Sequence, residues 1–99
     1  MRLSTRTQKI IRDTSQEIFG SEATVTLFGS RVDDFARGGD IDLLIQSEAP
    51  IAQRGRKALT LVARLQIRLG DQPIDVLVLD PKTTRQPVNE EALRVGVKL

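Results

Sequence analysis

The sequence predicts an α/β (α+β) protein: a small mixed β-sheet of three to four strands with helices packed on it. The first reason is that helix-like and strand-like apolar patterns alternate along the 99 residues, in the order αβαβαβα. The second is that glycine or proline stands at most of the changes from one pattern to the next. No linker, repeat or low-complexity segment interrupts the sequence, so we expect a single domain over residues 1–99.

Three stretches show the periodicity of amphipathic helices. Residues 5–19 place isoleucines near one face, and Thr5 with Gln8 matches a capping box at the start. Residues 89–95 predict a short last helix before a glycine. Residues 51–69 predict the longest helix, whose apolar stripe consists of Ala58, Leu61, Val62, Leu65 and Leu69.

Three apolar runs rich in β-branched residues predict strands over residues 23–28, 40–46 and 73–79. Side chains alternate across a strand, so each strand presents two different faces. The third strand places Asp75 on one face with Leu77 and Leu79. In the second strand, one face consists of Asp40, Asp42 and Leu44, and the better core face consists of Ile41, Leu43 and Ile45.

The composition excludes several classes of function. The absence of cysteine rules out a disulfide scaffold, a thiolate nucleophile and a cysteine-ligated zinc site, and the absence of histidine rules out imidazole chemistry. Any metal is then expected to be oxygen-ligated Mg²⁺ or Mn²⁺. With three Phe, no Trp or Tyr, and a net charge of +2, nucleic acid is not expected as the main partner. There is no run of membrane-spanning length and no signal peptide, so we expect a cytoplasmic protein with no membrane partner.

Three acidic residues lie in strand-like runs, where acids are normally depleted. Asp40 and Asp42 are two residues apart, which places their Cα atoms roughly 6.6 Å from each other with both side chains on one side. Asp75, on another strand, can complete a cluster whose mutual repulsion a divalent cation would relieve. A lone Asp-x-Asp is more often a turn or a cap, and Asp75 alone could be an edge-strand acid facing water. The combination of all three favours a metal site.

A Gly29-Ser30 pair ends the first strand and precedes a short helix expected over residues 31–36. Glycine at such a turn lets a phosphate approach the backbone, and the start of the helix offers free N–H groups. Gly-Ser alone is a common turn. Next to the acids, however, it predicts a site for a nucleoside triphosphate with Mg²⁺, where attack on phosphorus could occur.

Taken in order, Gly29-Ser30, nine further residues, Asp40-Ile41-Asp42 and then Asp75 resemble the DNA polymerase β-type nucleotidyltransferase superfamily, in particular its minimal nucleotidyltransferase branch. The resemblance implies that Gly29, Ser30 and Arg31 bind nucleotide. It also implies that the three aspartates bind two Mg²⁺ (or Mn²⁺) ions, and that Asp75 can activate the attacking hydroxyl.

The same resemblance implies transfer of a nucleoside monophosphate, with AMP from ATP expected first, to a hydroxyl acceptor. Minimal members commonly pair with a small helical HEPN-type protein encoded nearby, and some act as antitoxins by adding AMP to a tyrosine of that protein. Two alternatives stay open: a non-catalytic antitoxin that acts by binding, and transfer to a small molecule such as an aminoglycoside. Relatives of the latter kind usually have extra domains, and we expect none beside the single domain of residues 1–99.

The sequence departs from the minimal branch between the two motifs. Many members have ten residues rather than nine before the first acid, and many have serine at the position of Gly39. Asp33 and Asp34 lie in a loop that is often arginine-rich, which puts the acceptor in doubt more than the metal. Without a second domain to bind an acceptor, part of the site is expected to come from another chain.

Other charged or apolar residues admit simpler interpretations. Asp33, Asp34 and Asp80 are expected to be caps or turn residues. Arg54, Arg56 and Lys57 are expected on a solvated helix face, with a partner or RNA contact as the alternative. For Arg31 and Arg37, solvation and a role in binding the triphosphate or a partner are about equally favoured. Leu59 and Ile67 are left over from the core stripe and could serve a homo-oligomer or HEPN interface. The sequence leaves open the base preference, the acceptor and the oligomeric state.

Overall fold

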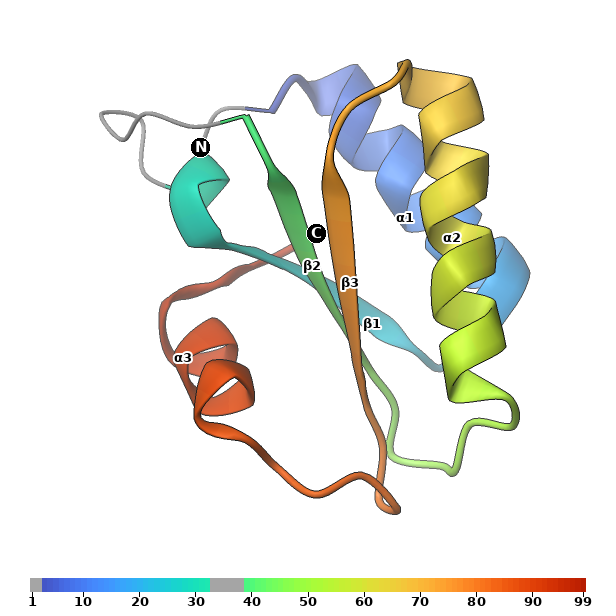
Figure 1. Cartoon of the computed structure of the whole chain (residues 1–99), viewed down its shortest axis with the longest axis vertical. Coiled ribbons are helices and arrows are strands. Elements are labelled where there is room, and N and C mark those ends of the chain that lie inside the picture. Colours follow the sequence, from blue (N-terminus) through green and yellow to red (C-terminus); the bar gives the residue numbers. More distant parts are fainter. Residues whose placement is uncertain (1–2, 33–38) are drawn as a thin grey trace.

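A computed structural model describes residues 3–32 and 39–99. None of the helices in these residues is long and apolar enough to cross a membrane. This part of the chain contains three α-helices and a four-stranded sheet, which confirms the predicted α+β class. Figure 1 shows their arrangement. The elements in order are α1 (Thr5–Phe19), β1 (Thr24–Phe28), the 3₁₀ turn η1 (Gly29–Val32), β2 (Ile41–Gln46), α2 (Arg54–Leu69), β3 (Ile74–Leu79), α3 (Pro87–Val95) and β4 (Val97–Lys98).

The sheet is mixed, as the sequence predicts, with the strand order β3-β2-β1-β4. β1 runs antiparallel to both β2 and β4, whereas β2 and β3 are parallel and joined through α2. Parallel neighbours need such a crossover because a hairpin reverses the chain once and therefore joins antiparallel strands. β4 has only two residues, too few for an apolar pattern to predict it.

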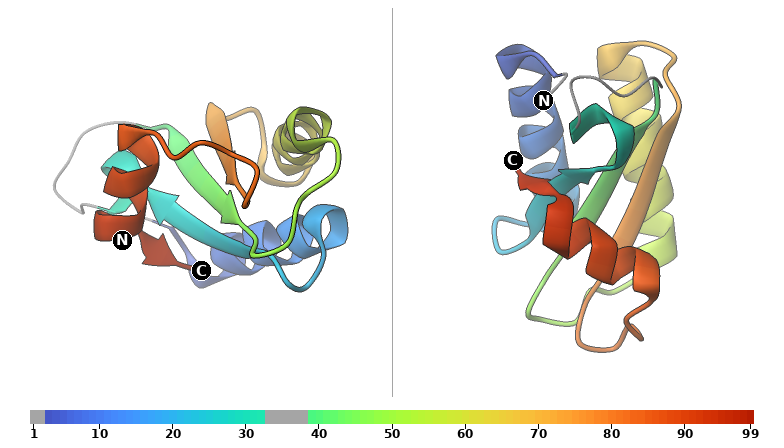
Figure 2. Two further views of the ribbon diagram at one scale, coloured as in Figure 1. Left: turned by 90° about the horizontal axis from the view of Figure 1, so that it is seen from below. Right: turned by 90° about the vertical axis from the view of Figure 1, so that its left-hand side faces the viewer.

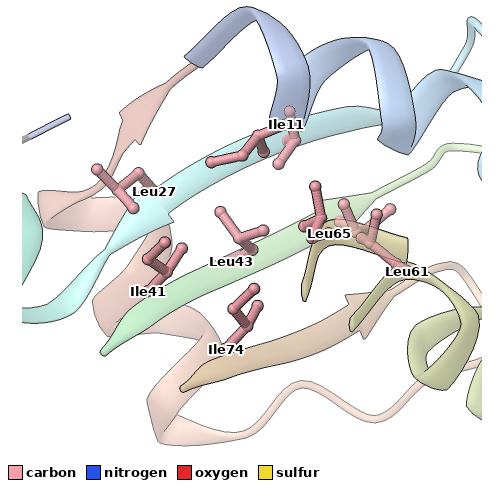
Figure 3. Close-up of a cluster of buried hydrophobic side chains, with 9 residues drawn as sticks. Ile11, Leu27, Ile41, Leu43, Leu61, Leu65 and Ile74 are labelled. Carbon is pink, nitrogen blue, oxygen red and sulfur yellow. The ribbon is translucent and has the colours of Figure 1, made fainter. Parts of the chain in front are cut away.

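Helices α1 and α2 lie side by side on one face of the sheet, and α3 lies on the other (Figures 1 and 2). The first face holds the main core, in which the predicted core side of β2 is fully buried. Figure 3 shows how α1 and α2 close over that face. The labelled members of the core are Ile11, Leu27, Ile41, Leu43, Leu61, Leu65 and Ile74.

The second face has a smaller apolar cluster beneath α3. Leu44 of β2 and Leu79 at the end of β3 are buried against Ala92 of α3, with Phe28, Leu77 and Leu93 packed around them. Gly96, which follows α3, lies so close to β1 that a Cβ there would collide with the Thr26 methyl group and the Ala92 carbonyl. α3 is therefore seated directly on this face.

Several element boundaries differ from the sequence prediction. α1 is capped by Ser4, whose Oγ accepts from Thr7 N at 3.1 Å, rather than by Thr5. α2 begins at Arg54 instead of residue 51, because Gln53 has a left-handed backbone (φ 56°) and the buried Ile51 donates its N–H to Asp80. α3 begins earlier than predicted, since proline is favoured in the first turn of a helix.

The expected helix over residues 31–36 is replaced by η1 as far as the structure describes it, and residues 33–38, including Asp33, Asp34 and Arg37, lie outside the described residues. β2 begins at Ile41, so Asp40 precedes the strand rather than opening it. In the described residues, the segment after β1 is the 3₁₀ turn Gly29–Val32, whose backbone N–H groups could contact an anion.

Candidate functional site

Asp42 and Asp75 lie side by side on the second face of the sheet. The parallel register of β2 and β3 pairs them directly, and neighbouring strands are about 4.8 Å apart. Leu43 points into the main core, so alternation directs Asp42 to the opposite face, together with Leu44. Two acids that are 33 positions apart in the sequence thus come together at one end of the sheet.

The electrostatics of Asp42 show how close these acids are. Partial burial raises the pKa of Asp42 above its ordinary value, and the nearby charges of Asp75 and Asp40 and a hydrogen bond with Asp75 raise it further. Burial and like charges both disfavour the ionised form of a carboxylic acid. An added cation would reverse this effect, because its charge would favour ionised carboxylates.

Asp40 is exposed and lies just before β2. Among residues 3–32 and 39–99, no three acidic side chains are grouped closely enough to hold a metal ion as they stand. The structure therefore brings together Asp42 and Asp75, with Asp40 near enough to affect the pKa of Asp42. The assignment of Asp40 as a third ligand stays a prediction.

Gly29 brings the turn after β1 against Asp42. Its φ is +76°, a conformation that glycine adopts without a steric penalty. A Cβ at Gly29 would also collide with the Asp42 carboxylate. This position therefore requires glycine for two independent reasons, and Gly29-Ser30 begins η1 directly beside Asp42.

Arg31, the next residue of η1, is half-buried and contacts two other segments. Its Nη2 donates to the Gly39 carbonyl oxygen at 3.0 Å and to Gln72 Oε1 at 3.4 Å. Sequence reasoning missed Gln72, which lies in the turn between α2 and β3. No local pattern could have indicated it, because the contact joins residues 41 positions apart.

Asp80, after the end of β3, forms a separate polar cluster at the other end of the sheet. Its carboxylate accepts hydrogen bonds from Ile51 N at 2.7 Å and Thr83 Oγ1 at 2.7 Å, and pairs with Arg54 at 3.2 Å. These interactions, with the hydrogen bond from Ile51 first, lower the pKa of Asp80 to about 2. The predicted role of Asp80 in a turn is confirmed, and Arg54, whose side chain is 38% exposed, forms an ion pair with it in addition to facing solvent.

A hollow of about 800 Å³ in the described surface is not next to the acids. It lies near the Gln46 end of β2, whereas Asp42 is at the other end of that strand. Its mixed lining includes Thr24, Thr26 and Leu93 and contains no tight group of acids. The paired carboxylates and the constrained glycine are more specific features than this open depression, so we place the candidate site at Asp42.

Residues 8–96 match the sequence profile of the nucleotidyltransferase domain. The chain therefore belongs to this family and to the DNA polymerase β-type nucleotidyltransferase superfamily, as its motifs predict. The general activity of the family is transfer of a nucleoside monophosphate, with a nucleoside triphosphate as substrate and divalent metals. A comparison with curated proteins finds no match for this chain.

Proposed function

We propose that this chain is a metal-dependent nucleotidyltransferase of the minimal branch that transfers AMP from ATP to a hydroxyl acceptor. The observation that supports this most is the in-register pair Asp42 and Asp75 with Gly29 packed against Asp42, in a chain of the nucleotidyltransferase family. The proposed acceptor is a tyrosine of a small helical HEPN-type partner encoded nearby, which makes the protein an antitoxin acting in the cytoplasm.

The donor chemistry of the site fits Mg²⁺ or Mn²⁺. All its candidate ligands are carboxylate oxygens, which suit hard divalent cations. Burial and then the neighbouring negative charges raise the pKa of Asp42, and a bound cation would offset both effects. Asp40, Asp42 and Asp75 would hold two ions. When bound, such ions polarise the attacked phosphoryl group and neutralise the charge of the leaving pyrophosphate.

The protein groups would then bind and orient the reactants. Gly29, Ser30 and Arg31 form the nucleotide-binding segment, where the glycine leaves room for phosphate oxygens near the backbone. The acceptor hydroxyl oxygen forms a bond to the α-phosphorus, and the bond from this phosphorus to the oxygen bridging the β-phosphorus breaks, so that pyrophosphate leaves. Asp75, which is exposed, accepts the proton of the acceptor hydroxyl.

The outer side of α2 supports the proposal of a protein partner. Leu59 and Ile67 are 73% and 84% exposed, eight residues apart on the side of the helix that faces away from the sheet. Large exposed apolar side chains at such spacing form a stripe that a partner helix can cover. The HEPN-type partner, or a second copy of the chain, would bury this stripe.

One observation favours a second candidate, a non-catalytic antitoxin that acts by binding. In the described residues the acids do not form a ready-made three-ligand metal site. A chain that neutralises its partner by contact alone would need the α2 stripe and would not need the acids.

A transfer experiment tests the first candidate. The purified chain is incubated with Mg²⁺, the HEPN-type protein encoded beside it and ATP labelled in the α-phosphate, with γ-labelled ATP as the control. We expect label on the partner from α-labelled ATP only, because AMP is transferred and pyrophosphate leaves. No transfer from any labelled nucleoside triphosphate, although the partner is bound, would contradict the proposal.

Two variants separate the candidates. For the catalytic antitoxin, Asp42→Asn abolishes neutralisation while binding persists, whereas Leu59→Gln with Ile67→Gln weakens binding itself. For the non-catalytic antitoxin, Asp42→Asn neutralises its partner as well as the unmodified chain does. Neutralisation is measured as growth rescue of cells that express the partner, and binding as co-purification.

A further inference from the structure

We propose that Arg31 is a positioning residue that fixes the phosphate-binding turn relative to both segments that lead into the acids. The inference rests on the proposed function and gives Arg31 a role through other residues, beyond contact with nucleotide. One guanidinium group joins three separate parts of the site: η1, to which Arg31 itself belongs, Gly39 before Asp40, and Gln72 before β3.

The first link fixes the start of β2. Arg31 Nη2 donates to the carbonyl oxygen of Gly39, the residue immediately before Asp40, at 3.0 Å. Because this acceptor is a main-chain atom, the contact restrains the backbone that leads directly into Asp40 and Asp42. It also joins the two sides of the connection between η1 and β2.

The second link fixes the start of β3. Gln72 Oε1 accepts from Arg31 at 3.4 Å, and its amide nitrogen donates to the Leu69 carbonyl oxygen at 3.1 Å. The carbonyl oxygen of Gln72 in turn accepts from the side chain of Gln66 at 3.2 Å. Gln72, which is three residues before Asp75, is thus held against the last turn of α2. Its side chain therefore offers Arg31 an acceptor in a fixed position.

The two linked segments also bond directly to each other, since Ile41 N donates to the Pro73 carbonyl oxygen at 3.0 Å. Arg31 therefore closes a network around the ends of the two strands that hold the acids. A planar guanidinium can donate to two acceptors in fixed directions, whereas the ammonium of lysine is a compact point charge on a flexible stem. Lysine at this position is expected to keep the charge and lose the geometry.

A kinetic double-mutant cycle on the full chain, with Mg²⁺·ATP and the acceptor protein, tests this role. Gln72→Ala removes the anchor and leaves every residue of η1 unchanged, and Arg31→Lys replaces the planar guanidinium that donates to both acceptors. We expect Gln72→Ala to lower kcat by roughly 10- to 100-fold, with KM for ATP within about twofold, because misplacement by about 1 Å costs such factors, and Arg31→Lys to lower kcat at least as far. The double variant should be no slower than the slower single variant, because the two residues act as one unit.

If Arg31 acted only by binding the phosphate, Arg31→Lys would raise KM for ATP at least tenfold without lowering kcat, and Gln72→Ala would leave both parameters unchanged. That result overturns the inference. Arg12→Lys, at an exposed position on α1, is the matched control and should be neutral.

Amide hydrogen exchange at Ile41 separates failure of this inference from failure of the proposed function, because it needs no activity. The Ile41 amide should exchange at least tenfold faster in Arg31→Lys and in Gln72→Ala than in Arg12→Lys. Equal exchange in all three chains overturns the inference even if the enzyme is active. Faster exchange in a chain without transfer activity overturns only the proposed function.

Discussion

The two faces of the sheet share the same strands and have opposite properties. On the face covered by α1 and α2, β2 contributes Ile41, Leu43 and Ile45, all fully buried. On the other face, the alternating residues of the same strand are Asp42, Leu44 and Gln46, of which Leu44 alone is buried. β2 thus contributes Ile41, Leu43 and Ile45 to the main core and, from its opposite face, Asp42 to the candidate site.

This difference indicates how a chain of 99 residues can hold several acidic side chains close together without losing much of its folding stability. The core face stabilises the protein through burial of apolar side chains. The site face opposes stability locally, because burial and neighbouring acids disfavour the ionised form of Asp42. Changes on the two faces should therefore affect activity and stability in opposite ways.

The largest expected effect is on the site face. Asp42→Asn combined with Asp75→Asn should lower nucleotidyl transfer by three orders of magnitude or more, as is typical when groups that act as a unit are removed. The midpoint of thermal unfolding should stay the same or rise, since the repulsion between the two carboxylates is gone. A double variant that remains active, or whose midpoint of thermal unfolding is well below that of the unmodified chain, would contradict the proposal that this face serves activity rather than stability.

The core face should show the reverse pattern. Leu43→Ala and Leu65→Ala each remove a fully buried side chain and should reduce the free energy of unfolding by about 2–5 kcal/mol. Leu59→Ala, at an exposed position on α2, is the control and should change it by no more than about 0.5 kcal/mol. Urea denaturation measures all three, and equal losses for Leu43→Ala and Leu59→Ala would count against a core on this face.

Gly29 allows a test of the contact between the turn after β1 and the Asp42 carboxylate. Gly29→Ala should destabilise the chain through its positive φ and through collision with the Asp42 carboxylate, and should also abolish transfer. Gly70→Ala is a matched control: Gly70 has φ +98°, and a Cβ there would meet no atom within 4 Å. Only the backbone cost of about 1 kcal/mol then remains. Equal losses of stability in the two variants, measured by urea denaturation, would show that the contact with Asp42 is unimportant.

The polar cluster at Asp80 should give a smaller effect, visible in acid. Its folded-state pKa of about 2 is below the ordinary value, so its contribution to stability is complete above the unfolded-state pKa and decreases as the pH falls toward 2. Asp80→Asn should lower the melting temperature at pH 7 by several degrees and flatten its dependence between about pH 4 and 2. Asp71→Asn, at an exposed position, is the control, and equal pH profiles for both variants would refute this role.

Much of the fold could be predicted because its signals are local. Alternation in β2 and the stripe of Leu61 and Leu65 in α2 follow from the periods of strand and helix. The end of α1 follows from Gly20, which is its C-cap. The start of α2 could not be predicted in this way, because the N–H of Ile51 donates to the Asp80 carboxylate, 29 residues away.

The site was predictable only in part for the same reason. Motif spacing indicated Gly29, Asp42 and Asp75, and the parallel register of two strands brings the acids together. The sequence placed Asp40 inside the strand, whereas β2 begins one residue later. The contact of Arg31 with Gln72 depends on how η1 and the end of α2 meet in space, which no local pattern encodes.

A titration with Mn²⁺, followed by electron paramagnetic resonance of the free ion, tests whether the acids on this face of the sheet bind metal. The chain with its natural acids is compared with the Asp42→Asn, Asp75→Asn double variant at neutral pH in the presence of ATP. We predict bound Mn²⁺ in the first and, in the second, only the amount that ATP binds in a protein-free control. Equal binding of Mn²⁺ by both folded chains would contradict a metal site formed by the acids on this face of the sheet.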